Sequence, residues 1–443
     1  MPLHTEKIYE ENSAMRKLAL LAIVALCCIS GAAFAQSDMP TFCGTLSEAD
    51  CAIVTNAQET MRSLDSISFD MNVDVAVSNI PDMTAPVTAN LSGNGSVTGM
   101  QALRGFADMS ALAGSDPGTA IADALSAFNL DLSLTLTLPP AIMGEMLGPS
   151  APGDVTLEVR MVDGVGYVNT EPLQPLFGSS SSSMGMQGWF GLDIAGMIQA
   201  IFDQIPANMM GEMMSMMESQ MGSSMGYMQL FQDPDMLSEF VRVTRTDDGS
   251  GDVATFATSV DLEALMSNEQ FRDMIMQQIE SQMSSQNQEM SDEEMEMALG
   301  ISEQMMQGMV IKVNEEIGVS DGYLHSITGS LIIDTEAMMN AISASIAAGM
   351  GGTVSETEEP TPAPVVNIDF AINYGDYNSV APITAPEDAQ VIPYEMILQS
   401  MMGSMGDMGS MGNGTDSSGG ASSGGMGEAG AVPQETPESE SSG

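Results

Sequence analysis

The sequence feature that most constrains the fold is the strict alternation of apolar and polar side chains in several segments. Between Ile67 and Val77 every second residue is apolar, and the positions between them carry Ser, Asp, Asn and Ala. In Leu130–Leu138 leucines alternate with Asp, Ser and Thr. Successive side chains of a strand point to opposite faces, so this pattern predicts strands with one buried and one solvated face. Such strands are typical of antiparallel sheets.

Alternation and turn residues predict more strands, several of them paired as hairpins. They are Val87–Leu91, Gly95–Thr98, Leu103–Met109, Val155–Met161, Val165–Asn169, Gly188–Asp193, Glu239–Thr246, Asp252–Val260, Val310–Ile317, Tyr323–Asp334 and Val366–Tyr374. Gly93-Asn94-Gly95 predicts a turn between the first two, and Asp163-Gly164 predicts a hairpin turn.

Between these strands lie segments with helical spacing. Ala52–Leu64 has one apolar face, and Ser267-x-x-Gln270 forms a capping box ahead of another apolar face. Ala195–Met228 is predicted to form two short helices, separated at Pro206, whose apolar stripe is rich in methionine. The fold class expected is therefore α+β, with a curved antiparallel sheet, or half-barrel, wrapped around Met-rich apolar helices.

Methionine is flexible and polarizable, so a Met-rich surface can fit apolar ligands of variable shape. We expect this layer to line a ligand cavity, although an ordinary hydrophobic core would show the same pattern. The residues expected to line the cavity are Ile198, Ile201, Met210, Met213, Met214 and Met217.

The chain is strongly acidic, with Lys+Arg 10, Asp+Glu 60 and a net charge of −50. This charge excludes binding to nucleic acid backbones and disfavours anionic lipid surfaces. It predicts a solubilising surface, since no twelve-residue Ca²⁺ loop with spaced carboxylates is present.

Met15–Ala35 has the three parts of a secretory signal. Arg16 and Lys17 precede an apolar run, and Ala33-Phe34-Ala35 is an A-x-A cleavage site. We expect export to the periplasm or extracellular space and cleavage after Ala35, with translation starting at Met1 or Met15. A lipid anchor at Cys27 or Cys28 is the less favoured alternative, because neither cysteine follows a small residue.

After cleavage two cysteines remain, Cys43 and Cys51. Export and their spacing predict a disulfide that closes a small loop. The expected organisation is a presequence and signal at 1–35, a short segment with the cysteine pair at 36–51, an α+β domain at 52–393 and a disordered tail rich in Met, Gly, Ser and Glu at 394–443.

No catalytic motif stands out, and we expect neither an enzyme nor a cofactor or bound metal. Gly222-Ser223-Ser224-Met225-Gly226 matches the G-x-S-x-G elbow but lies in a Met/Ser-rich run without the required strand and helix. His325, the sole histidine after the signal, has no nearby residues in the sequence that would form a catalytic or metal-binding group with it. Clustered methionines such as Met210 and Met213 leave copper(I) binding as one alternative.

Three segments resemble the LolA-like/LppX–LprG superfamily of lipoprotein and lipid carriers. They are NAQETMRSLDSISFDMNVDV (Asn56–Val75), VRMVDGVGYVNTEP…GWFGLDI (Val159–Ile194) and NYGDYNSVAPITAPEDAQVIP (Asn373–Pro393). The resemblance covers the order of elements over Ala52–Pro393. It implies a curved antiparallel sheet around helices, with acyl chains held in the apolar space between the two layers.

The function expected is non-enzymatic binding or transport of a lipid or other long apolar molecule outside the cytoplasm. Transient contact with a membrane or a partner carrier would fit such a role. The alternatives are a Met-rich copper(I)-binding protein and a surface structural protein without a ligand. The oligomeric state and the identity of the ligand stay open at this point.

Overall fold

A computed structural model describes residues 41–80, 85–107, 116–140, 142–143, 153–172, 188–204, 234–284, 299–300, 306, 308–335 and 363–396. The chain divides into two compact units, Met1–Tyr394 and Glu395–Gly443. Every helix and strand named below belongs to the first unit.

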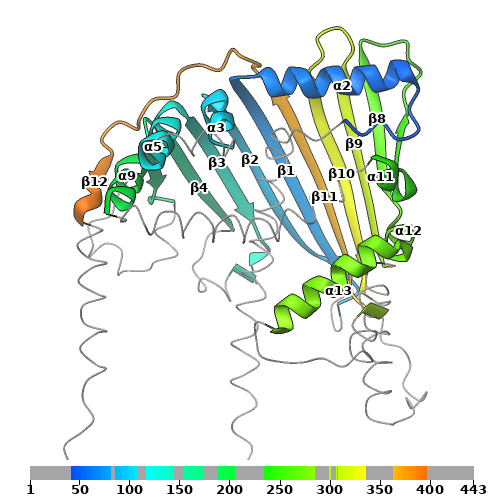
Figure 1. Cartoon of the computed structure of the whole chain (residues 1–443). Coiled ribbons are helices and arrows are strands. Elements are labelled where there is room, and N and C mark those ends of the chain that lie inside the picture. The colour runs from blue at the N-terminus through cyan, green and yellow to red at the C-terminus, as the bar shows by residue number, and fades with distance from the viewer. Residues whose placement is uncertain are drawn as a thin grey trace, which may run out of the picture. The chain divides into compact units, whose positions relative to one another are not determined.

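The strands of the described residues form one open sheet of twelve, in the order β12-β6-β5-β4-β3-β2-β1-β11-β10-β9-β8-β7 (Figure 1). Their bounds are β1 (Ser66–Ser78), β2 (Val87–Thr98), β3 (Asn129–Thr137), β4 (Asp154–Val162), β5 (Val165–Asn169), β6 (Trp189–Asp193), β7 (Val241–Arg245), β8 (Val253–Val260), β9 (Met309–Gly318), β10 (Leu324–Asp334), β11 (Val365–Gly375) and β12 (Gln390–Ile392). All neighbours are antiparallel except β12 and β6, which are parallel. The α+β class and the antiparallel sheet are confirmed.

The helices precede strands or connect them. They are α2 (Glu48–Ser63), α3 (Met100–Ala107), α5 (Pro117–Ala127), α9 (Ile194–Gln204), α11 (Pro234–Phe240), α12 (Leu262–Ser267) and α13 (Glu269–Ser284). Side-chain caps that accept a backbone N–H stand before several helices, among them Ser47 for α2, Asp116 for α5 and Asp261 for α12.

The capping box predicted at Ser267 is wrong. Ser267 ends α12, and its hydroxyl donates to the Glu263 carbonyl at 2.9 Å. Asn268 lies between α12 and α13, and its side-chain oxygen accepts the Phe271 N–H at 3.1 Å. Asparagine is as good an N-cap as serine, and the extended backbone of Asn268 suits the cap position.

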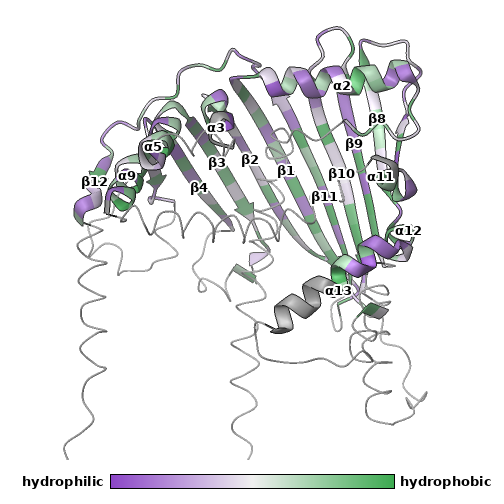
Figure 2. Ribbon diagram, viewed as in Figure 1, coloured by the Kyte–Doolittle hydropathy of each residue, from purple (hydrophilic) through white to green (hydrophobic). Residues whose placement is uncertain are grey.

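The register gives the sheet two faces of opposite character. On β1, Met71, Val73 and Val75 are buried, whereas Asp70 and Asp74 are exposed. Directly opposed residues share a face, so pairing extends this division to the neighbouring strands. We call the face of Met71 the inner face and the face of Asp70 the outer face. Figure 2 shows the resulting alternation of hydrophobic and hydrophilic positions along the strands.

The turn predicted at Gly93-Asn94-Gly95 is wrong, because β2 runs straight through it. Gly95 lies opposite Phe69 on the inner face, and a Cβ there would be 2.5 Å from Phe69 Cζ. A Cβ at Gly93 would be 2.6 Å from Leu134 Cδ2. These glycines therefore make room for large side chains of β1 and β3, a common use of glycine within a strand.

The strand predicted over Leu103–Met109 is also wrong. Residues 103–107 belong to helix α3, which follows β2 after Gly99, whose φ is 74°. The helix packs against the end of α2: the Gln101 amide donates to the Ser63 carbonyl at 3.0 Å, and Arg104 Nη2 donates to the Met61 carbonyl at 3.2 Å. These contacts satisfy carbonyls at the C-terminus of α2, and tertiary packing overrides the weak alternation.

The segment after β11 ties the centre of the sheet to α2. Asn378 Oδ1 accepts the Asp65 N–H at 2.8 Å, where α2 gives way to β1. The Tyr377 hydroxyl contacts the carbonyl oxygens of Leu324 at 2.8 Å and Tyr374 at 3.1 Å. The chain then crosses to the far edge of the sheet, where β12 pairs with β6 (Figure 1). The short β12 was not predicted from the sequence.

Candidate functional site

The inner face of the sheet is the candidate functional site, because it is a broad apolar surface shared by most of the strands. Its central cluster contains Met71, Val73 and Val75, which are 6–8% exposed. Among the described residues, those packed against this cluster all lie on strands: Phe69, Ala89, Leu91, Leu134, Val366, Ile368, Phe370 and Ile372.

Described helices pack on the inner face toward the β7 edge. Ala57 of α2 is 3% exposed and packs with Val243, Ala254, Phe256 and Ile317 from β7, β8 and β9. A second cluster joins α11, α12 and α13, with Phe240 1% exposed. Its buried members are Met236, Leu237, Phe240, Leu262, Leu265, Met266 and Phe271.

Toward the β12 edge, α9 packs on β5 and on α5. A Cβ at Gly166 would lie 2.6 Å from Ile194 Cδ1, and one at Gly118 would lie 2.7 Å from Phe202 Cβ. Glycine at these two positions thus lets α9 approach β5 and α5 closely. The central cluster lies on strands between these two groups of helices in the sheet order.

The residues predicted to line a cavity are only partly described. Ile198 and Ile201 lie on α9, as the spacing predicts, and Ile198 is half-buried. Ile201 is 41% exposed, because α9 turns Phe202 rather than Ile201 toward α5. Met210, Met213, Met214 and Met217 lie outside the described residues, so the predicted Met-lined layer stays a prediction.

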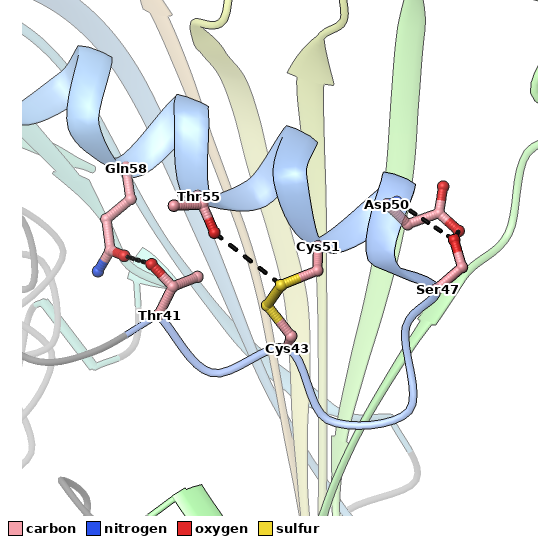
Figure 3. The surroundings of a disulfide bond; sticks show 7 residues. All are labelled: Thr41, Cys43, Ser47, Asp50, Cys51, Thr55 and Gln58. Carbon is pink, nitrogen blue, oxygen red and sulfur yellow. Dashed lines mark hydrogen bonds between the residues drawn. A yellow bond between two sulfur atoms is a disulfide. The ribbon is translucent and has the colours of Figure 1, made fainter.

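The predicted disulfide is present in the structure. It joins Cys43, in the segment before α2, to Cys51 in the first turns of the helix, with Cα atoms 5.3 Å apart (Figure 3). The Thr41 hydroxyl also donates to Gln58 further along α2. The disulfide thereby holds the segment against the helix.

The same segment covers the edge strand β7. Thr45 Oγ1 donates to the Val243 carbonyl at 3.1 Å, so this backbone acceptor of the edge strand already has a hydrogen-bond partner. Arg245, the last residue of β7, contacts Asp247 at 2.7 and 2.9 Å and Asp50 of α2 at 2.8 Å. Hydrogen bonding to Arg245 holds the pKa of the Asp247 carboxyl well below its usual range. An edge strand that is covered in this way is protected from pairing with other chains.

Glu315 and Tyr374 place polar groups on the inner face of the sheet. Glu315 of β9 lies opposite Phe256 and Ile327, and Tyr374 of β11 lies opposite Phe69. Burial raises the pKa of the Glu315 carboxyl. Burial, followed by the nearby Glu315 charge, raises the pKa of Tyr374 to about 12. Neither residue was singled out from the sequence, although Glu315 occupies an apolar position of the alternation in β9.

Other chemistry in the described part of the chain is sparse. His325 Nε2 lies 3.0 Å from Asp321 Oδ2, and its side chain is 36% exposed. Tyr323 and Tyr377 stack nearby, with ring centroids 4.0 Å apart. Among the described residues, no three His, Cys, Asp or Glu side chains are grouped to hold a metal ion, and no helix is long and apolar enough to cross a membrane.

In comparisons with protein-family models and with curated proteins, the sequence matches none. The resemblance to LolA-like carriers therefore stays a prediction, and the proposals that follow are argued from the structure and the sequence.

Proposed function

We propose that this protein is an exported, non-enzymatic carrier or binding protein for a lipid or another long apolar molecule. The observation that carries the proposal is the broad, mainly apolar inner face, whose central cluster is built from strand residues between two groups of helices. Large, contiguous apolar surfaces on a sheet need a cover, and a ligand is one such cover. The finer proposal is a half-barrel that wraps around Met-rich helices containing Ile198, Ile201, Met210, Met213, Met214 and Met217.

The energetics require a long ligand. Burying a chain stabilises the complex by ~0.8 kcal/mol per CH₂ group. Association costs on the order of 4–15 kcal/mol in lost freedom of motion, and a chain of roughly twelve carbons supplies about 10 kcal/mol, near the middle of that range, whereas an alkyl group of two or three carbons supplies too little. An acyl chain or a similarly extended hydrocarbon fits this requirement.

The proposed export rests on the signal at Met15–Ala35 and on the disulfide, since disulfides persist in oxidising compartments. N-terminal sequencing of the secreted protein should begin at Gln36. A lipid-modified Cys27 or Cys28 at the N-terminus would contradict this and indicate a lipoprotein.

Ligand binding is tested on the full chain without its signal, by native mass spectrometry, lipid extraction and uptake of the neutral dye Nile red. Leu331 lies on the inner face opposite Ile368, and Ser330 lies on the outer face of the same strand opposite Asp369. Leu331→Trp should lower dye uptake with an unchanged circular dichroism spectrum, whereas Ser330→Trp should not. No uptake by the wild type, or equal uptake by the two folded variants, would rule out the carrier function.

A further inference from the structure

Glu315 occupies a place where a charged side chain has a high energetic cost. The inner-face positions of β9 are otherwise apolar: Met309, Ile311, Val313 and Ile317. Glu315 lies between Phe256 of β8 and Ile327 of β10, which are both on the inner face. Burying an unpaired carboxylate is strongly unfavourable, so an isolated one on an apolar surface is a candidate for recognition.

The carboxyl of Glu315 has no hydrogen bond or ion pair within the described part of the chain. The next residue, Glu316 on the outer face, accepts a hydrogen bond from the Ser326 hydroxyl at 2.9 Å. Arg245 is the other charged side chain at the described inner-face positions, and Asp50 and Asp247 already neutralise it. Glu315 is therefore available to an incoming group.

Tyr374 provides a second polar atom near Glu315. Ile372, two residues earlier on β11, lies opposite Ile327, which in turn lies opposite Glu315. Residues two apart on a strand share a face, so Tyr374 of β11 and Glu315 of β9 lie on the same face of the sheet, with β10 between their strands. The charge of Glu315 contributes to the raised pKa of Tyr374, as expected for groups this close.

We propose that Glu315 and Tyr374 together anchor the head group of the apolar ligand, and that this head group donates hydrogen bonds and carries no negative charge. A long-chain amine or alcohol has this chemistry. The inference rests on the proposed function, because it names the ligand class that the inner face would take.

Charge decides against an acidic head group. A carboxylate or phosphate would approach an acidic side chain, in a protein of net charge −50, without a free cation at the described inner-face positions. A protonated amine would instead form a charge-assisted hydrogen bond with Glu315, and such bonds are about twice as strong as neutral ones. An alcohol would donate to Glu315 and accept from the Tyr374 hydroxyl.

The test compares three ligands with the same chain length, dodecylamine, dodecanol and dodecanoate, at pH 7 and at concentrations below their micelle or solubility limits. Each displaces Nile red from the full chain without its signal. The wild type should bind dodecylamine and dodecanol at least about tenfold more tightly than dodecanoate, which is the difference expected from one charge-assisted bond. Equal affinities for the three ligands would overturn the proposal.

Variants of Glu315 and Tyr374 then test whether these two residues contact the head group. Glu315→Gln should lower dodecylamine affinity about tenfold while Nile red still binds, because the amide cannot carry the charge. Tyr374→Phe removes only a hydroxyl and should weaken dodecanol severalfold, which keeps the test decisive if Glu315→Gln does not fold. Glu316→Gln, on the outer face, is the matched control and should change nothing.

The two proposals fail in different ways. If the wild type takes up no Nile red, the carrier function itself is wrong, and the head-group anchor fails with it. If Nile red binds but dodecylamine affinity is unchanged in Glu315→Gln and dodecanol affinity is unchanged in Tyr374→Phe, the anchor alone is wrong, and Glu315 is only a buried carboxyl.

Discussion

The close contact between Gly95 and Phe69 allows a quantitative test of the strand register. In Gly95→Ala the new Cβ would lie 2.5 Å from Phe69 Cζ, 2.9 Å from Cε1 and 3.1 Å from Cε2. Carbon atoms pack at about 3.5–4.0 Å, so the ring must retreat by about 1 Å. Overpacking of this kind destabilises the folded state by ~1–3 kcal/mol, and alanine in place of glycine within a strand stabilises it by ~0.5–1 kcal/mol.

We therefore expect Gly95→Ala to lower the free energy of unfolding by about 1 kcal/mol, and by at most about 2.5 kcal/mol. In a Phe69→Leu background the crowding ring atoms are gone, so the same substitution should become neutral or stabilising by up to ~1 kcal/mol. Urea unfolding of the four proteins measures the coupling. Gly153→Ala, where a Cβ would meet no atom within 4 Å, is the control.

The reversal of sign is the decisive result. If Gly93-Asn94-Gly95 formed a turn, Gly95 would not face Phe69, and alanine would have the same effect in both backgrounds. Equal effects would refute the register of β1 with β2.

Three further predictions concern the disulfide and two carboxyl groups. Cys43→Ser/Cys51→Ser opens a loop of sequence separation 8, which should cost about 2.5 kcal/mol in urea unfolding by the chain-entropy relation, and thiol reagents should label neither cysteine in the denatured, unreduced wild type. The pKa of Glu315 is raised from 4.5, so the folded state holds this proton more tightly than the unfolded state and loses stability as pH rises through the raised pKa. The free energy of unfolding of Glu315→Gln, relative to that of the wild type, should therefore be higher at pH 7 than at pH 4. The pKa of Asp247 is lowered from 3.8 by Arg245, so the ionised carboxylate stabilises the folded state above pH 3.8, and this stabilisation is lost as pH falls. Asp247→Asn should be less stable than the wild type at pH 7, and the difference should shrink toward pH 2.

Alternation alone predicted the architecture well, because each strand has one buried face. The predicted strands at Leu130–Leu138 and Val366–Tyr374 differ from β3 and β11 by one residue at each end. The pattern also separates the inner from the outer face, which is the basis of the candidate site. The order of strands in the sheet could not be predicted, because β1 pairs with β11 across nearly the whole chain.

The errors come from residues whose role depends on a distant neighbour. Gly95 reads as a turn residue until Phe69 is known to lie over it. Arg104 reads as part of a strand until its contact with Met61 is known. Glu315 went unnoticed because carboxylates are abundant in this chain, although its place in the alternation of β9 already put it on the inner face.

The position of Glu315 is informative even though carboxylates are abundant in this chain, because the other carboxylates of the central strands lie on the outer face. On the outer face Asp74 and Asp369 lie directly opposite each other, an arrangement that costs free energy. Water screens those charges, and the Asn90 amide donates to Asp74 at 2.8 Å, so the cost there is small. The Glu315 carboxyl, on the inner face, has no hydrogen-bond donor among the described residues. An acidic chain can place its carboxylates on the outer face at little cost, so the inner position of Glu315 calls for a specific explanation, and a ligand that donates hydrogen bonds supplies one.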